Sequence, residues 1–136
     1  MASAGEVVGE WKRRLRAGEW AQMGEIVDLD GYTEICLGLT GWTTGYDVAT
    51  QNYMKNMVEP WSNQVLEERD VIEGEEAVVT RFHVEATHTG EFLGIAPTGR
   101  RIEWDAVNIV RVHGDKVVGQ WAQPDLWGMH HQLTAP

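Results

Sequence analysis

The stretch Thr87–Trp104, THTGEFLGIAPTGRRIEW, connects two long segments in which apolar and polar residues alternate. The two segments, residues 75–90 and 99–123, overlap its two ends and have the two-residue period of β-strands. The Gly- and Pro-rich centre of the stretch predicts a loop or bulge. The later segment turns back on itself at HGDK, 113–116, which indicates a hairpin. With a further strand predicted over 63–74, the C-terminal half is typical of an antiparallel sheet.

The N-terminal half has the period of helices. Residues 4–18, 19–27 and 46–61 place apolar side chains three and four positions apart, and the glycine-punctuated stretch 37–45 is expected to be a loop. Helices followed by an antiparallel sheet predict an α+β fold. We expect a single domain, 1–136, in which the helices and a long curved sheet form a cone that encloses a pocket.

Composition narrows the functional classes. The chain has 136 residues, 43% of them hydrophobic, and a formal net charge of −10, which disfavours nucleic acid and anionic membranes as partners. Its one basic cluster (Lys12, Arg13, Arg14 and Arg16) is expected to be a solvated helix face. No signal pattern or apolar run of ~18 residues is present, so we expect a cytoplasmic protein. The single cysteine, Cys36, excludes an intrachain disulfide and is expected to be a small buried hydrophobe.

Three motifs carry a resemblance to a known family. The string 87–100, the hairpin 111–117 and WAQPDLWGMHHQL over 121–133 resemble the SnoaL-like polyketide cyclases. The resemblance is strong in the C-terminal half and extends to the helices only in order and length. It implies the cone of the nuclear transport factor 2-like superfamily. That scaffold carries aldol cyclases, cofactor-free hydroxylases, isomerases and epoxide hydrolases, and fold alone does not choose among them.

Asp125 is the first candidate for chemistry. It lies between Trp121 and Trp127 in apolar surroundings, and the resemblance assigns it the role of general acid/base. An aspartate facing an apolar cavity would have a raised pKa, suited to proton transfer near neutral pH. The alternative is that Asp125 caps the short helix that follows, because Asp is favoured at the N-cap. Both roles are compatible.

Three polar residues on the predicted strands could act together with Asp125. Arg81 and His83 share one face of their strand and could orient Asp125 or polarise a substrate oxygen. The alternative is a solvated or dimer-facing side of the sheet, with Arg81 paired to Glu85 or Glu103. Asn108 shares a face with Trp104 and could hold a carbonyl oxygen or water, although it cannot act as a base.

Cofactor sites are not predicted. His83, Glu85 and His88 are the best metal set in the sequence, but they do not share one strand face, and His88 is expected to fix its loop by hydrogen bonds. The Gly-rich loop lacks a dinucleotide-binding pattern. We therefore expect neither metal nor organic cofactor.

The function expected from these features is cofactor-independent acid/base chemistry at carbon on an aromatic polyketide intermediate, by aldol-type cyclisation or hydroxylation. Aromatic walls for the substrate are expected from Tyr32, Trp42, Trp104, Trp121 and Trp127. The alternatives are an isomerase or epoxide hydrolase, or a non-catalytic ligand-binding or dimerisation domain. A homodimer is expected through the sheet, with Phe82, Val84, Val107 and Ile109 near the contact.

Overall fold

A computed structural model describes residues 2–136. Helix α1, Ala4–Ala17, begins at a capping box in which Ser3 and Glu6 exchange hydrogen bonds, and it ends at Gly18, whose φ of 70° suits glycine. A 3₁₀ turn, η1 (Trp20–Glu25), follows. Helix α2, Tyr46–Tyr53, continues into a π-helical turn, η2 (Met54–Val58), and α3 spans Leu126–Thr134.

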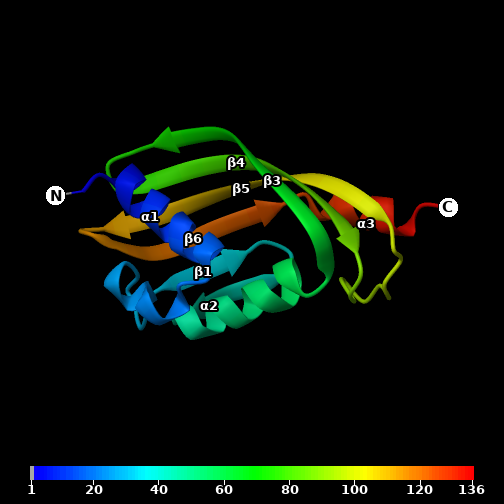
Figure 1. Cartoon of the computed structure of the whole chain (residues 1–136), viewed down its shortest axis with the longest axis horizontal. Helices are drawn as coiled ribbons and strands as arrows, with labels where there is room; N and C mark the ends of the chain where they lie inside the picture. The colour runs from blue at the N-terminus through cyan, green and yellow to red at the C-terminus, as the bar shows by residue number, and fades with distance from the viewer. Residues whose placement is uncertain (1) are drawn as a thin grey trace.

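Six strands form one sheet in the order β2-β1-β6-β5-β4-β3 (Figure 1). The four long strands are β3 (Trp61–Glu73), β4 (Ala77–His88), β5 (Arg101–His113) and β6 (Lys116–Pro124), all antiparallel neighbours as predicted. The hairpin between β5 and β6 turns at Gly114, with φ of 61°.

Two strands were not predicted. Strands β1 (Thr33–Cys36) and β2 (Thr40–Thr44) lie in a region expected to hold only helices and loops. They are four and five residues long, too short for a clear two-residue period. Strand β1 also pairs with β6 in parallel, so the sheet is mixed and not purely antiparallel.

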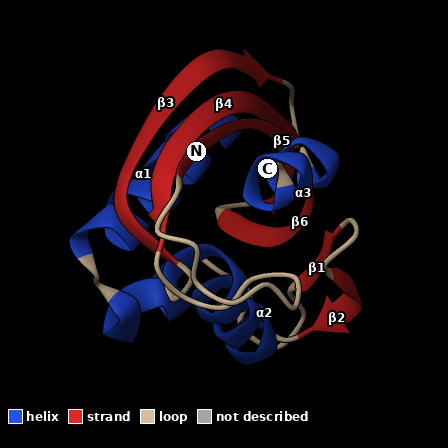
Figure 2. Cartoon of the chain, turned by 90° about the vertical axis from the view of Figure 1, so that its right-hand side faces the viewer, coloured by secondary structure: helices blue, strands red, loops and turns tan. Residues whose placement is uncertain are grey.

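The sheet is curved and does not close (Figure 2). Its concave side faces α1 and α2, and α3 lies across the end near β5. This arrangement confirms the predicted α+β cone. The core forms two clusters, one beneath α1 and α2 and one between the sheet and α3. No helix in residues 2–136 is long and apolar enough to cross a membrane.

The loop between β4 and β5 is held by His88, as predicted. The imidazole is buried, and its Nδ1 accepts a hydrogen bond of 3.1 Å from the Thr98 backbone amide. The His88 backbone amide donates to the Arg100 carbonyl and its carbonyl accepts from the Gly99 amide, so the two ends of the loop are joined. Burial lowers the pKa of His88, which favours the neutral ring that this acceptor role requires.

Candidate functional site

A cavity of about 380 Å³ lies between the concave face of the sheet and the helices. This volume is in the range of small-molecule sites. Its wall is mainly apolar and aromatic. The predicted apolar stripe of the third helix faces it through Tyr46, Ala49, Tyr53 and Met57. The remaining aromatic lining residues are Trp11, Trp20, Tyr32, Phe82 and Trp104.

Two acids line this cavity, Glu34 and Glu68; Glu68 is paired with Lys12, and Glu34 has no cationic partner among residues 2–136. Glu34 lies on β1, and because side chains alternate along a strand it shares the inward face with Tyr32 and Cys36, which also line the cavity. The Tyr32 hydroxyl donates a hydrogen bond of 2.6 Å to Glu34 Oε1, and Gln120 Nε2 donates one of 3.1 Å to the same oxygen. Among residues 2–136, no group donates to Oε2. One carboxylate oxygen is therefore anchored and the other is available to a ligand.

Burial governs the electrostatics around Glu34. Desolvation raises the pKa of its carboxyl above the ordinary value, and the hydrogen bonds from Tyr32 and Gln120 oppose this rise. Desolvation also raises the pKa of the Cys36 thiol to about 11, so the thiol is protonated at neutral pH. The Glu34 carboxylate is therefore a stronger base than an exposed glutamate, whereas Cys36 is a poor nucleophile.

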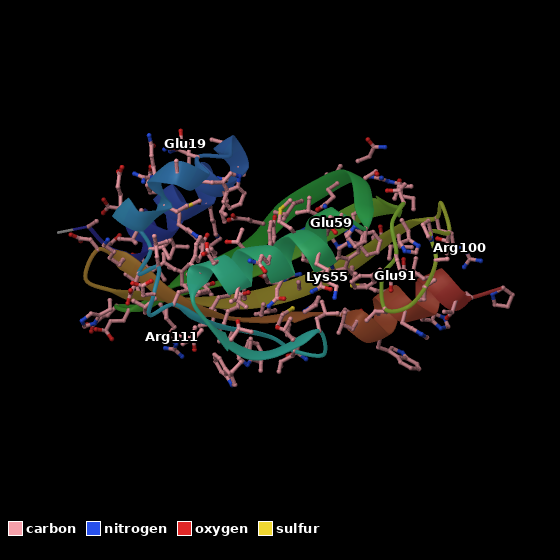
Figure 3. All side chains as sticks on the ribbon, turned by 90° about the horizontal axis from the view of Figure 1, so that it is seen from below. Glu19, Lys55, Glu59, Glu91, Arg100 and Arg111 are labelled. Atoms are coloured by element: carbon pink, nitrogen blue, oxygen red, sulfur yellow. The ribbon has the colours of Figure 1, made fainter. Side chains whose placement is uncertain are left out.

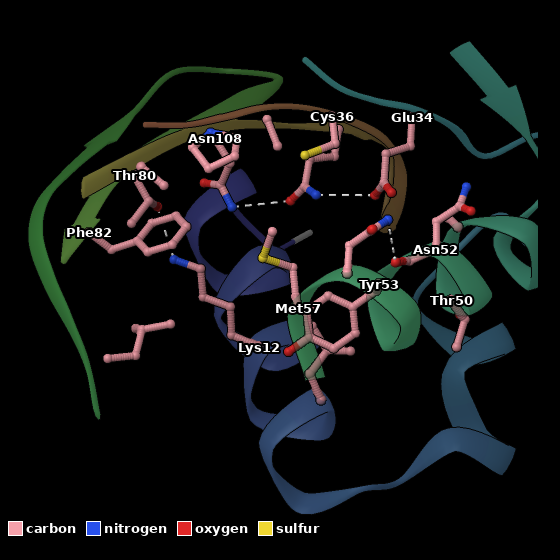
Figure 4. Close-up of a pocket in the computed structure, with 18 of the residues that line it drawn as sticks. Lys12, Glu34, Cys36, Thr50, Asn52, Tyr53, Met57, Thr80, Phe82 and Asn108 are labelled. Carbon is pink, nitrogen blue, oxygen red and sulfur yellow. Dashed lines mark hydrogen bonds between the residues drawn. The ribbon is translucent and has the colours of Figure 1, made fainter. Parts of the chain in front are cut away.

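A polar line crosses the pocket floor from Glu34 (Figure 4). Gln120, which donates to Glu34, accepts a hydrogen bond of 3.1 Å from Asn108 Nδ2. Asn108 is the direct cross-strand partner of Thr80, whose hydroxyl accepts a hydrogen bond of 3.0 Å from Lys12 Nζ. Asn108 Oδ1 is buried and has no hydrogen-bond partner among the described residues. It is therefore an unsatisfied buried acceptor on a residue that lines the pocket.

Three of the predicted site residues line this cavity: Asn108, Tyr32 and Trp104. Asn108 and Trp104 share one face of β5, as the alternation of that strand predicts, and the structure shows that this face is the inward one. Tyr32 is fully buried and its hydroxyl holds Glu34.

Asp125 does not line the cavity, and the prediction of an apolar environment for it is wrong. Asp125 is exposed, and its carboxylate accepts a hydrogen bond of 3.0 Å from the Gly128 backbone amide at the start of α3. The chain leaves the sheet after Pro124, the last lining residue, and the Asp125 amide donates to the Asp105 carbonyl. This turns the side chain toward the helix, which confirms the alternative of an N-cap.

Arg81 and His83 also lie outside the cavity. They are on the convex face, where Arg81 pairs with Asp70 at 2.7 Å and with Asp105 at 3.7 Å, and His83 Nδ1 lies 2.6 Å from Asp105 Oδ1. The His83 contact lowers the pKa of Asp105. These groups satisfy one another at the surface, as the alternative of a solvated sheet side predicts, although the partners of Arg81 differ from those expected.

Three predicted aromatic walls are likewise absent from the cavity. Trp42 on β2 is 66% exposed, and Trp127 on α3 is 80% exposed and stacks on His131. Trp121 pairs with Ile109 across the sheet, and both residues alternate with the inward-facing Gln120 and Asn108. Trp121 is therefore on the convex face.

The strand alternation also corrects the residues expected at a dimer contact. Phe82 and Val84 line the cavity, so they cannot form an external contact through the sheet. Val107 and Ile109 are on the convex face. There an apolar row crosses five strands, made by Ile72, Val79, Ile109, Trp121 and Ile35.

One group of potential metal ligands occurs in the described residues. His83, Glu85 and Glu103 bring ligand atoms within 4.8 Å of one another on the convex face. Glu85 also contacts Arg101 at 3.7 Å, and Glu103 is exposed. His88, expected to belong to the best metal set, is buried at the other side of β4. The group is remote from the cavity and is not part of the candidate site.

Comparison with known proteins decides the family. The model of the SnoaL-like polyketide cyclase family matches residues 6–133, nearly the whole chain. The chain belongs to the SnoaL-like polyketide cyclase family. This confirms the resemblance seen in the C-terminal motifs and extends it over the helices. A search of curated proteins finds no relative of this sequence.

Solved structures of SnoaL-like proteins have the same fold. A SnoaL-like polyketide cyclase from Agrobacterium tumefaciens has a TM-score of 0.74 at 16% identity, with 98% of this chain and 99% of that one covered. IdmH from Streptomyces antibioticus, provisionally described as a polyketide cyclase, gives 0.74 at 21%, covering 97% and 99%. AclR from Streptomyces galilaeus, provisionally described as a hydroxylase, gives 0.73 at 22%, covering 96% and 80%. At these identities the likeness concerns the fold.

Sequence reasoning missed Glu34, Gln120 and Lys12 as site residues. Glu34 was hidden in TEICLGL, which looked simply apolar. The usable signal is the alternation Tyr32, Glu34, Cys36, which puts the acid on the same side as a residue already expected in the pocket. This side faces inward because β1 pairs in parallel with β6. No pattern in the sequence near β1 indicates that pairing.

Proposed function

We propose that this SnoaL-like protein catalyses cofactor-independent acid/base chemistry at carbon on an aromatic polyketide intermediate, with Glu34 as the acid/base group. The observation that carries the proposal is the state of the Glu34 carboxylate: it lines an apolar cavity, Oε1 is held by Tyr32 and Gln120, and Oε2 is free. A desolvated carboxyl with a raised pKa is a stronger base than an exposed one, which suits proton abstraction from carbon.

The reaction that we propose is an intramolecular aldol closure. The Glu34 carboxylate removes a proton from a carbon next to a carbonyl, and the electron pair of the C–H bond moves onto the carbonyl oxygen to give an enolate. The enolate carbon then attacks a second carbonyl carbon of the same molecule. A new C–C bond forms, and the resulting alkoxide takes the proton back from Glu34. No oxidant or reductant is consumed.

The surrounding residues support this chemistry. The unpartnered Oδ1 of Asn108 can accept a hydrogen bond from an enol or hydroxyl group, and its amide nitrogen is held by Gln120. Tyr32 and Gln120 orient the Glu34 carboxylate. Trp104, Phe82 and Tyr53 offer flat apolar surfaces to an aromatic ring system. The mainly apolar wall lowers the local dielectric, which strengthens these polar interactions.

The test is proton exchange at carbon with a simple probe. 2-Tetralone combines an aromatic ring with an enolisable ketone and is small enough for the cavity. Its α-proton exchange in D₂O, followed by NMR, should be faster with the protein than in buffer. Glu34→Gln should lower the protein-dependent rate by ~10²–10⁴-fold, the usual worth of a general base. Exchange no faster than in buffer, or a variant as active as the parent, would support a non-catalytic binding domain instead.

We also propose that the chain forms a homodimer through the convex face. The support is the apolar row of Ile72, Val79, Ile109, Trp121 and Ile35, of which Ile72 is 65% exposed in the single chain. Light scattering at tens of micromolar should give twice the chain mass for the parent and the chain mass for Ile109→Glu. A monomeric parent would refute the dimer.

A further inference from the structure

The basic cluster of α1 is divided between two sides of the helix. Arg13 is exposed and Arg14 packs toward η1, and each contacts two carboxylates within 3.5 Å. Lys12 and Arg16 line the cavity instead. They are four residues apart, so they are neighbours on one helix face. The expectation that all four residues form a solvated face is therefore correct for only part of the cluster.

Lys12 is placed to bind a ligand. Its ammonium donates to Thr80 Oγ1 at 3.0 Å and to Glu68 Oε1 at 3.1 Å, and its side chain is only 16% exposed. An ammonium has three donors, so one N–H remains without a protein acceptor among residues 2–136. Figure 4 shows the Lys12 ammonium pointing toward Thr80 on the pocket wall.

Arg16 supplies a second, independent observation. Within the part of the chain that the structure describes, it has no carboxylate within 4.0 Å and makes no side-chain hydrogen bond, unlike Arg13 and Arg14. Arg16 is an unpaired guanidinium, and one of the three N–H donors of Lys12 is free. This end of the cavity is positive because the two cations exceed the single carboxylate of Glu68. The protein as a whole carries −10, so a local positive site must overcome a repulsive field to attract an anion.

We propose that Lys12 and Arg16 form a carboxylate-binding subsite, and that the substrate is an aromatic acid whose carboxylate is bound there. This inference rests on the proposed function only in placing the reacting carbon toward Glu34, at the other end of the polar line. The line from Lys12 through Thr80, Asn108 and Gln120 to Glu34 separates the two ends, as Figure 4 shows. The substrate carboxylate is thereby kept away from the Glu34 carboxylate, which would repel it.

The test compares 2-naphthoate with 2-naphthamide, which has the same shape and no charge, by calorimetry at pH 7 and low salt. The parent should bind the acid roughly tenfold or more tightly than the amide, since charged hydrogen bonds are the strong ones. Lys12→Met should remove most of this preference. Arg16→Gln, at an exposed residue without partners, should reduce it without affecting folding. Lys55→Met is the matched control, because Lys55 lies exposed on η2, outside the cavity lining (Figure 3).

Two results would overturn the subsite: equal affinity of the parent for the acid and the amide, or loss of affinity for both probes alike in Arg16→Gln. The proposed function can fail separately. Glu34→Gln should lose most of the protein-dependent tetralone exchange and keep the preference for 2-naphthoate. A parent protein that prefers the acid but exchanges no protons would retain the subsite and lose the reaction.

Discussion

Tyr32, just before β1, and Glu34, on β1, are two residues apart and both face the cavity, and the Tyr32 phenol donates a hydrogen bond of 2.6 Å to the Glu34 carboxylate. The Tyr32 ring is fully buried and packs edge-on against Tyr46, with ring centroids 5.0 Å apart. Its position is therefore determined by the core, and the hydrogen bond transmits that rigidity to the Glu34 carboxylate.

Removing the Tyr32 hydroxyl should raise the pKa of Glu34 further, because that hydrogen bond stabilises the ionised form and opposes desolvation. In Tyr32→Phe, the acid limb of the pH profile for tetralone exchange should move to higher pH. Tyr53→Phe is the control, since Tyr53 also lines the cavity but donates no hydrogen bond to Glu34. A profile that is the same in both variants would show that Tyr32 does not tune the acid.

Glu34 should also make stability depend on pH in a defined direction. Its folded-state pKa is raised above the ordinary value of 4.5, so the folded protein binds the proton more tightly than the unfolded chain. The contribution of Glu34 to the free energy of unfolding should therefore fall as pH rises from about 4.5 through the folded-state pKa, and then level off. Glu34→Gln does not titrate and should gain stability relative to the parent over that window.

Urea unfolding of both proteins between pH 4 and pH 8 measures this difference, and other titrating groups cancel in the comparison. A parent that becomes more stable than Glu34→Gln as pH rises would contradict the raised pKa.

The N-cap role of Asp125 at the start of α3 can be tested by its effect on stability. Asp125→Ala should lower the free energy of unfolding by ~1 kcal/mol, whereas Asp125→Asn should cost little, because Asn is nearly as good at this position. Thermal unfolding of the two variants measures this. If both variants lost stability equally, the charge and not the hydrogen bond would be responsible.

Two tryptophans make a matched pair for ligand binding. Trp104 lines the cavity and is buried, whereas Trp127 is 80% exposed on α3. Binding of 2-tetralone should quench fluorescence in Trp127→Phe as in the parent, and the quenching should be reduced in Trp104→Phe. The reverse result would place the ligand near α3 and outside the cavity.

The long elements were predictable because each repeats its pattern many times. Alternating residues identify β4 and β5, and the same alternation places Asn108 and Trp104 on one face of β5, although it does not say which face lines the pocket. Asp125 was misplaced for a different reason. Its motif and apolar neighbours say nothing about the direction in which the chain leaves the sheet after Pro124, and that direction decides whether the carboxylate meets a cavity or a helix terminus.

Glu34 and Lys12 illustrate what local sequence lacks. Lys12 comes from α1 and Glu34 from a four-residue strand, and they share a cavity only because β1 pairs in parallel with β6 and α1 packs across the sheet. An acid within a short apolar stretch is a sign of a functional site. Whether the acid faces a cavity depends on contacts between residues 86 positions apart, as in the Gln120–Glu34 hydrogen bond.

The choice between Glu34 and Asp125 as the acid/base group is the central claim, and one comparison tests it most directly. The rate of α-proton exchange in 2-tetralone should be measured for the parent, Glu34→Gln and Asp125→Asn under the same conditions. We expect Glu34→Gln to lose ~10²–10⁴-fold of the protein-dependent rate and Asp125→Asn to keep it. Loss of exchange in Asp125→Asn, with full activity in Glu34→Gln, would contradict the assignment of Glu34.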